Sequence, residues 1–124
     1  MSKKILIVDD SKAMRLIIRR TLRQAGLGEY EVQEAANGHE ALLAIEQHDP
    51  LLVLSDWNMP EMNGYELLTE IKARKLKLKF GFVTTEGTAE MQERATGAGA
   101  LFLIVKPFTP EQFRAALEPV LLAG

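Results

Sequence analysis

The sequence contains no cysteine, which excludes disulfide bonds, thiolate metal sites and thiol nucleophiles. Any chemistry at a functional site must therefore come from oxygen and nitrogen atoms. Long hydrophobic runs are also missing. The apolar run near the N-terminus covers only Ile5 to Val8, which is too short for the core of a signal peptide or for a membrane span. These absences favour a soluble, cytoplasmic protein without membrane contact.

A strong net charge is absent as well. The chain has 15 Lys and Arg against 17 Asp and Glu, for a net charge of −2, so we expect no direct binding of nucleic acid. The apolar fraction of 47% and the charged fraction of 26% are typical of a globular protein and exclude a disordered or fibrous chain. With 124 residues, we expect one compact domain.

The sequence does contain a regular alternation of short β-branched runs and segments of helical period. The predicted strands cover residues 4–9, 30–35, 51–55, 80–84 and 101–105. The predicted helices cover about 11–25, 38–47, 88–97 and 110–122, and a further helix follows Gly64. This alternation predicts an α/β fold in which helices cover both faces of a parallel sheet. Right-handed crossovers favour a doubly wound, five-stranded sheet of order 2-1-3-4-5, with residues 30–35 at an edge.

Polar residues directly follow four of the predicted strands. They are Asp9 and Asp10, Asp56, Thr84 and Thr85, and Lys106. Because the carboxyl ends of parallel strands meet at one edge of the sheet, we expect these side chains to converge on one pocket. Each residue alone has an ordinary structural explanation, such as a helix cap for Asp10 or a solvated end for Lys106. Capping alone does not explain the whole set.

The chemistry of these residues narrows what the pocket does. Three carboxylates brought close together repel one another at neutral pH, so one must protonate or a cation must join them. Oxygen ligands without His or Cys favour Mg²⁺ or Mn²⁺, and Mg²⁺ keeps part of its shell for water or phosphate oxygens. Lys106 and Thr84 offer a positive charge and a hydroxyl to such oxygens. Asp56, alone after the central strand, is the best placed nucleophile for forming an acyl phosphate.

Four motifs occur in order at the predicted strand ends: VDD (8–10), SDWNMPEMNG (55–64), VTTEG (83–87) and KPFT (106–109). This set resembles the receiver domain of two-component response regulators and is similar to stand-alone, CheY-type chemotaxis receivers. The resemblance spans essentially the whole chain. It implies a single receiver domain over residues 1–124 with a flavodoxin-like (βα)5 fold, and a signalling protein that promotes only its own phosphorylation and dephosphorylation rather than an enzyme.

The resemblance also implies a role for each carboxylate. Asp56 would accept a phosphoryl group from the phosphohistidine of a sensor histidine kinase or a histidine phosphotransfer protein. Asp10 and Asp56 would bind Mg²⁺, Asp9 would lie close by or act through water, and Asn58 would contribute its backbone carbonyl.

The remaining roles concern the phosphoryl group and the response to it. Thr84 and Lys106 would hold the phosphoryl oxygens, with Thr85 as the alternative hydroxyl, and the Lys106–Pro107 peptide bond would be cis. In receivers an aromatic side chain on strand five turns inward when this threonine moves. Here Leu103 stands at that place, three residues before Lys106.

The residue beside Leu103 is Phe102, which we expect to point to the opposite face of the sheet. The resemblance further implies a downstream target protein that binds the face between strand four and helix five, and a monomer or weak dimer. The basic residues Arg15, Arg19 and Arg23 recur every four residues. We expect them on a solvated helix face, with steering of an acidic kinase as the alternative.

Other functions remain as alternatives. The chain would be the receiver of a longer regulator if a DNA-binding domain followed Gly124. A Mg²⁺-dependent phosphohydrolase needs a general acid and a cap over its substrate, and 124 residues leave no room for them. A flavin mononucleotide carrier needs a phosphate loop rich in Ser, Thr and Gly, but the corresponding segment here is DDSKAM, residues 9–14.

Overall fold

A five-stranded parallel sheet forms the centre of the computed structural model, which describes residues 3–122. The strands are β1 (Lys4–Val8), β2 (Glu31–Ala35), β3 (Leu52–Ser55), β4 (Lys79–Thr84) and β5 (Leu103–Val105). Their order is β2-β1-β3-β4-β5, so the predicted order is confirmed and β2 is an edge strand. Strand β5 is shorter than predicted because its regular pairing with β4 begins only at Leu103.

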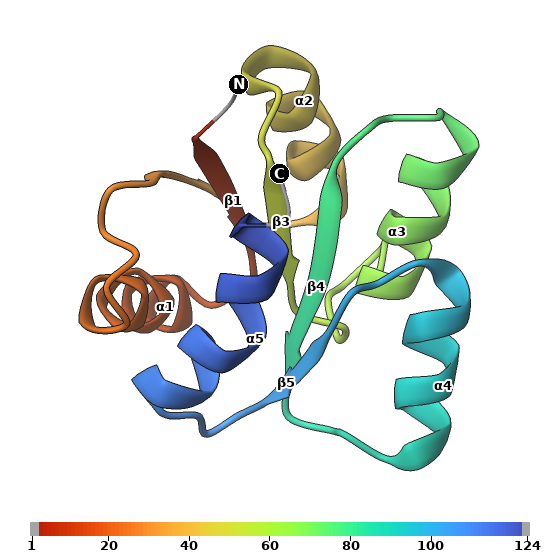
Figure 1. The fold of residues 1–124 in the computed structure, drawn as a ribbon. Coiled ribbons are helices and arrows are strands. Elements are labelled where there is room, and N and C mark those ends of the chain that lie inside the picture. The colour runs from red at the N-terminus through yellow and green to blue at the C-terminus, as the bar shows by residue number, and fades with distance from the viewer. Residues whose placement is uncertain (1–2, 123–124) are drawn as a thin grey trace.

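Within residues 3–122, four helices connect the strands and a fifth follows β5. They are α1 (Lys12–Gln24), α2 (Gly38–His48), α3 (Gly64–Ala73), α4 (Ala89–Ala98) and α5 (Pro110–Leu122). Figure 1 shows α1 and α5 on one face of the sheet and α2, α3 and α4 on the other. The α/β prediction is confirmed, and helices cover both faces as expected.

Alternation along β1 builds both halves of the hydrophobic core. Leu6 and Val8 join the cluster beneath α2, α3 and α4, whereas Ile5 and Ile7 join the cluster beneath α1 and α5. All four side chains are at most 1% exposed, because a central strand is covered on both faces. This burial fixes the position of β1, and Asp9 follows directly after its last residue, Val8.

Local sequence signals set the ends of the helices. Asn63 caps α3: its side chain accepts a hydrogen bond from the Glu66 backbone N–H at 2.8 Å, and the Glu66 carboxylate accepts one from the Asn63 N–H at 3.0 Å. This is a capping box, which satisfies two N–H groups that would otherwise lack partners. Gly99 ends α4 in the left-handed conformation, at φ 105°, which glycine adopts without steric cost.

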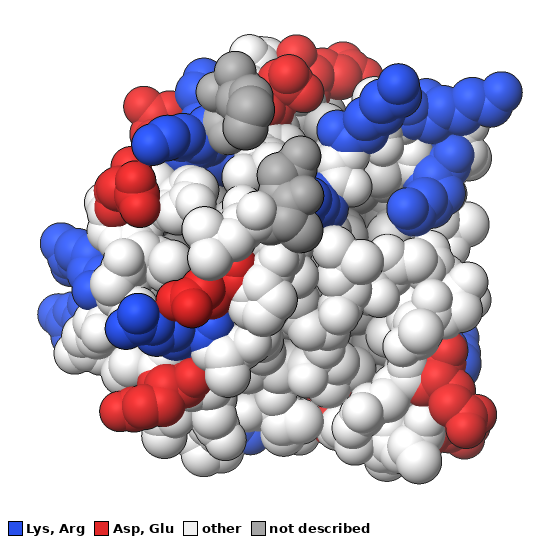
Figure 2. All heavy atoms as spheres, in the orientation of Figure 1, with Lys and Arg blue, Asp and Glu red and all other residues white. Residues whose placement is uncertain are grey.

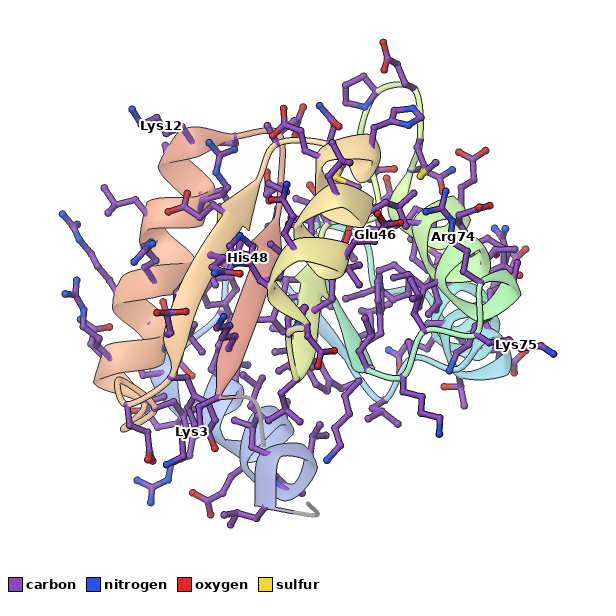
Figure 3. The ribbon with its side chains drawn as sticks, turned by 90° about the horizontal axis from the view of Figure 1, so that it is seen from above. Lys3, Lys12, Glu46, His48, Arg74 and Lys75 are labelled. Atoms are coloured by element: carbon purple, nitrogen blue, oxygen red, sulfur yellow. The ribbon has the colours of Figure 1, made fainter. Side chains whose placement is uncertain are left out.

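Ion pairs at the surface tie neighbouring helices together. Figure 3 shows Glu46 of α2 beside Arg74, which directly follows α3, and their closest charged atoms are 3.2 Å apart. His48 is the last residue of α2, shortly before β3 begins. It therefore lies at the opposite edge of the sheet from the predicted acidic residues, which follow the carboxyl ends of the strands. Among residues 3–122, none of the helices has the length and apolar character needed to cross a membrane.

Candidate functional site

The predicted acidic residues meet at the carboxyl edge of the sheet. Asp9 and Asp10 follow β1 and Asp56 follows β3, which is paired to β1. One carboxylate oxygen from each lies within 4.8 Å of the others. Asp9 is buried, Asp56 is partly buried and Asp10 is exposed. The reversal of strand order at β1 and β3 therefore brings three negative charges into one small space.

Lys106, which follows β5, reaches into this acidic cluster. Its Nζ donates to Asp9 Oδ2 at 2.9 Å and to Asp56 Oδ2 at 3.2 Å. The Lys106 side chain is only 9% exposed, so water screens these contacts less than it would at the surface. One ammonium offsets one of the three carboxylates, and two negative charges remain uncompensated at the site.

The three carboxylates differ in how firmly they are held. Asp9 Oδ1 accepts a hydrogen bond from the Ser11 backbone N–H at 2.8 Å, so both of its oxygens have partners. Asp56 Oδ1 accepts from the Asn58 backbone N–H at 3.3 Å. The Asp10 carboxylate has no hydrogen bond or ion pair within residues 3–122. Asp10 is thus the carboxylate most available to a new ligand.

Gly64 shapes the loop that carries Asp56. A Cβ atom on Gly64 would lie 2.1 Å from the Asp56 backbone carbonyl oxygen and 3.0 Å from the Phe82 ring. The Gly64 N–H also donates to the Trp57 carbonyl at 2.8 Å. Glycine is therefore required here for close approach of two backbone segments rather than for a positive φ.

The two threonines after β4 have different environments. Thr84 is 0% exposed, and its hydroxyl is buried without a hydrogen-bond partner in the described part of the chain. Thr85 is exposed. A buried hydroxyl without a partner is rare in folded proteins and calls for an explanation such as a bound group.

Comparison with known proteins identifies the family. A model of the response regulator receiver domain matches residues 5–118. The chain belongs to the response regulator receiver family. Receivers of this family act with a histidine kinase, so the protein is a component of two-component signalling.

Several individual receivers are similar to it. A CheY homologue of Campylobacter jejuni is 44% identical, over 98% of this chain and 94% of the relative's length. The chemotaxis protein CheY of Thermotoga maritima is 39% identical over 97% of this chain and 98% of its own length. Among solved structures, CheY4 of Vibrio cholerae has a TM-score of 0.84 at 34% identity, covering 97% of this chain and 99% of that one.

This receiver has Leu103 on β5 where the resemblance implied an aromatic side chain. Leu103 is partly buried against the core beneath α2, α3 and α4, whereas Phe102 packs against the core on the other face. The two side chains therefore lie on opposite faces, as expected. The Lys106–Pro107 peptide bond is cis, as the resemblance implied.

Trp57, next to Asp56, is a core residue. It is 6% exposed, and its ring lies 4.7 Å from that of Phe82 and 5.5 Å from that of Tyr65. The Arg94 guanidinium of α4 lies over the Tyr65 ring at 4.6 Å, a cation–π contact that links α4 to α3. A tryptophan in this position is a useful fluorescent reporter of changes around Asp56 of the receiver.

The expectation of a solvated arginine face was wrong for Arg15, whose side chain is 14% exposed, whereas the Arg19 side chain is 41% exposed. Arg15 Nε donates to Glu34 Oε1 at 2.8 Å, and Arg19 Nε donates to Glu34 Oε2 at 2.6 Å. The sequence did not predict this ion-pair bridge, because it joins a helix to an edge strand and no local sequence pattern predicts such a contact. Glu34 offsets one of the two positive charges of Arg15 and Arg19, which leaves this pair less suited to steering an acidic partner.

The bridge predicts a pH effect on stability. Burial alone raises the pKa of Glu34, but the hydrogen bonds and charges of Arg19 and Arg15 outweigh it and hold the pKa below the ordinary value of 4.5. The folded state then binds the proton less tightly than the unfolded state, so this stabilisation is present above pH 4.5 and is lost as pH falls through the lowered pKa.

We expect Glu34→Gln to lose less free energy of unfolding than the wild type when pH is lowered from neutral to below 4. Urea unfolding at the two pH values measures it. An equal loss in both proteins would contradict the assignment.

Proposed function

We propose that Asp56 accepts a phosphoryl group from the phosphohistidine of a sensor histidine kinase or a histidine phosphotransfer protein in a Mg²⁺-dependent reaction. The observation that carries this proposal is the cluster of three carboxylates within 4.8 Å, two of them held by Lys106. Such a cluster retains negative charge that a divalent cation offsets. Hard oxygen donors without nitrogen or sulfur suit Mg²⁺ or Mn²⁺.

The residues present fit this metal. Asp10 and Asp56 would bind Mg²⁺ directly, and the Asn58 carbonyl would join them. Asp9 would lie close by or act through water, because it is buried and its two oxygens accept shorter hydrogen bonds, at 2.8 and 2.9 Å, than those of Asp56, at 3.3 and 3.2 Å. When bound, Mg²⁺ supplies positive charge that stabilises the oxygens of the transferring phosphoryl group.

Asp56 would be the nucleophile. One carboxylate oxygen forms a bond to phosphorus while the bond from phosphorus to the imidazole nitrogen of the donor breaks. Lys106 would hold one phosphoryl oxygen through its ammonium group. Thr84 would donate its hydroxyl, which is buried and without a partner among residues 3–122, and Thr85 is the weaker candidate because it is exposed.

The output of the receiver would be phosphorylation-dependent binding of a target protein. Figure 2 shows that the surface in front of β5, between α4 and α5, carries few charged side chains. A groove in this region is lined by uncharged residues: Leu103, Ile104, Val105, Gln112, Ala115 and Ala116. Exposed apolar surface of this kind is typical of a protein interface.

The relatives favour chemotaxis as the pathway. The Campylobacter and Thermotoga proteins are named as chemotaxis proteins, and the chain spans nearly their whole length. We therefore propose a single receiver domain over residues 1–124, acting as a monomer or weak dimer in the cytoplasm, without catalysis beyond its own phosphorylation and dephosphorylation.

Incubation with acetyl phosphate tests the proposal. With Mg²⁺ present, we expect intact mass to rise by one phosphoryl group and Trp57 fluorescence to change, and EDTA should prevent both. Beryllofluoride, which mimics the phosphoryl group, should change the fluorescence without changing the covalent mass. Modification that proceeds equally well in EDTA would refute the proposed metal dependence.

A further inference from the structure

The placement of the Asp10 carboxylate depends on its backbone. Lys106 and backbone N–H groups hold Asp9 and Asp56, but the Asp10 side chain has no such contact within residues 3–122. Any group that holds the Asp9–Asp10 peptide unit in place therefore also restricts the positions that the Asp10 carboxylate can reach.

Arg15 is the side chain that holds this peptide unit. Its Nη1 donates to the Asp9 backbone carbonyl at 2.6 Å. That carbonyl shares a planar peptide unit with the Asp10 nitrogen, so the hydrogen bond restricts the plane from which Asp10 begins. The Arg15 side chain is only 14% exposed, and its own freedom is correspondingly small.

Glu34 in turn holds Arg15. Its Oε1 accepts from Arg15 Nε at 2.8 Å while its Oε2 accepts from Arg19 Nε at 2.6 Å. Arg19 also donates through Nη2 to the Val32 carbonyl at 3.1 Å. The chain of contacts thus runs from β2 through Glu34 and Arg15 to the backbone of Asp9.

We propose that Arg15 and Glu34 are positioning residues for Mg²⁺ binding, with Glu34 orienting Arg15 and Arg15 orienting the peptide that carries Asp10. This inference rests on the proposed Mg²⁺ site. Neither side chain touches the metal. Their effect is to reduce the conformational freedom that Asp10 loses when it becomes a ligand, as residues surrounding metal ligands commonly do.

An electrostatic effect and a positioning effect of Arg15 predict opposite changes in Mg²⁺ affinity when this side chain is removed. Removal of a positive charge near a cation site strengthens cation binding by electrostatics alone. Loss of the hydrogen bond to Asp9 weakens it by releasing Asp10. The sign of the change in affinity therefore distinguishes the two effects.

Mg²⁺ titration of the purified receiver, followed by Trp57 fluorescence and by calorimetry, measures this sign. We expect Arg15→Met to weaken Mg²⁺ binding by about tenfold. Glu34→Gln should weaken it less, and the double variant should bind no more weakly than Arg15→Met alone, because Glu34 acts through Arg15.

Lys12→Met is the matched control. Figure 3 shows Lys12 projecting from the start of α1, and it is exposed with no contact to the acidic cluster. Its removal takes one positive charge from the same helix, so we expect Mg²⁺ affinity to stay the same or to rise slightly. Thermal unfolding of every variant separates a loss of stability from a loss of metal affinity.

The outcomes separate the two proposals. A wild-type protein that binds no Mg²⁺ refutes the metal site, and the inference with it. A wild-type protein that binds Mg²⁺, with Arg15→Met binding as well or better, refutes the inference alone. Should Arg15→Met fail to fold, Arg15→Lys decides the question. It keeps the positive charge but loses the planar group that reaches both Glu34 and the Asp9 carbonyl, so unchanged affinity in that variant also refutes the inference.

Discussion

Asp56→Asn is expected to abolish phosphorylation of this receiver. An amide lacks the negative charge and nucleophilic oxygen that attack phosphorus, and the substitution also removes a proposed Mg²⁺ ligand. The side chain keeps its size, so the fold should remain. Intact mass after incubation with acetyl phosphate and Mg²⁺ should then show no modification above background.

Asp49→Asn provides a control with the same chemical change at another place. Asp49 is exposed at the end of α2 in the left-handed conformation, at φ 49°, which asparagine also adopts readily. Its phosphorylation should equal that of the wild type. If Asp56→Asn is modified as fast as the wild type, the acceptor is another residue and the proposed role of Asp56 is wrong.

Gly64→Ala is expected to cause the largest loss of stability among the conservative substitutions considered. The new Cβ would lie 2.1 Å from the Asp56 carbonyl oxygen. This neighbour belongs to the backbone, which cannot rotate away as the end of a side chain can. We expect a loss of about 3 kcal/mol in the free energy of unfolding, at the upper end for overpacking, as measured by urea denaturation.

Gly97→Ala is the matched control for this substitution. Gly97 lies within α4, and a Cβ atom there would meet nothing within 4 Å. Because alanine is the better helix former, this variant should be more stable than the wild type, by up to about 1 kcal/mol. Equal stability of Gly64→Ala and Gly97→Ala would show that the contact with Asp56 is not rigid.

Gly64→Ala should also slow phosphorylation. To relieve the clash, either α3 or the backbone at Asp56 must move, and a displacement of the nucleophile by a fraction of an ångström is costly in phosphoryl transfer. Rates of modification by acetyl phosphate, measured under conditions where the variant remains folded, check this effect. A normal rate would indicate that α3 moves and Asp56 stays in place.

The fold was predictable because its signals are local and repeated. The continuous apolar run at 51–55 and the alternation at 30–35 distinguish the central strand β3 from the edge strand β2. The apolar run at 101–105 did not reveal that β5 is the other edge of the sheet. Five such strands separated by helical segments leave few allowed topologies. The convergence of Asp9, Asp10 and Asp56 then followed, since all three lie directly after strands at the reversal of strand order.

The details that the sequence left open depend on register and on contacts between distant segments. A shift of one residue along β4 exchanges the environments of Thr84 and Thr85, so sequence alone did not decide which hydroxyl is buried. The need for glycine at position 64 comes from the backbone carbonyl of Asp56, which an added Cβ atom would meet. Neither fact has a local signature.

The sequence by itself determined the topology, the set of acidic residues and the family resemblance. The hydrophobic period and the residues that directly follow each strand can both be read from the order of residues along the chain. The tertiary structure decided which side chains hold which others. Lys106 bonds to Asp9 across 97 positions of sequence, and Arg15 is joined to Glu34 on a different element. Such pairs form only when packing of the core brings the elements together. They hold Asp9 firmly, whereas the Asp10 carboxylate has no such partner among residues 3–122.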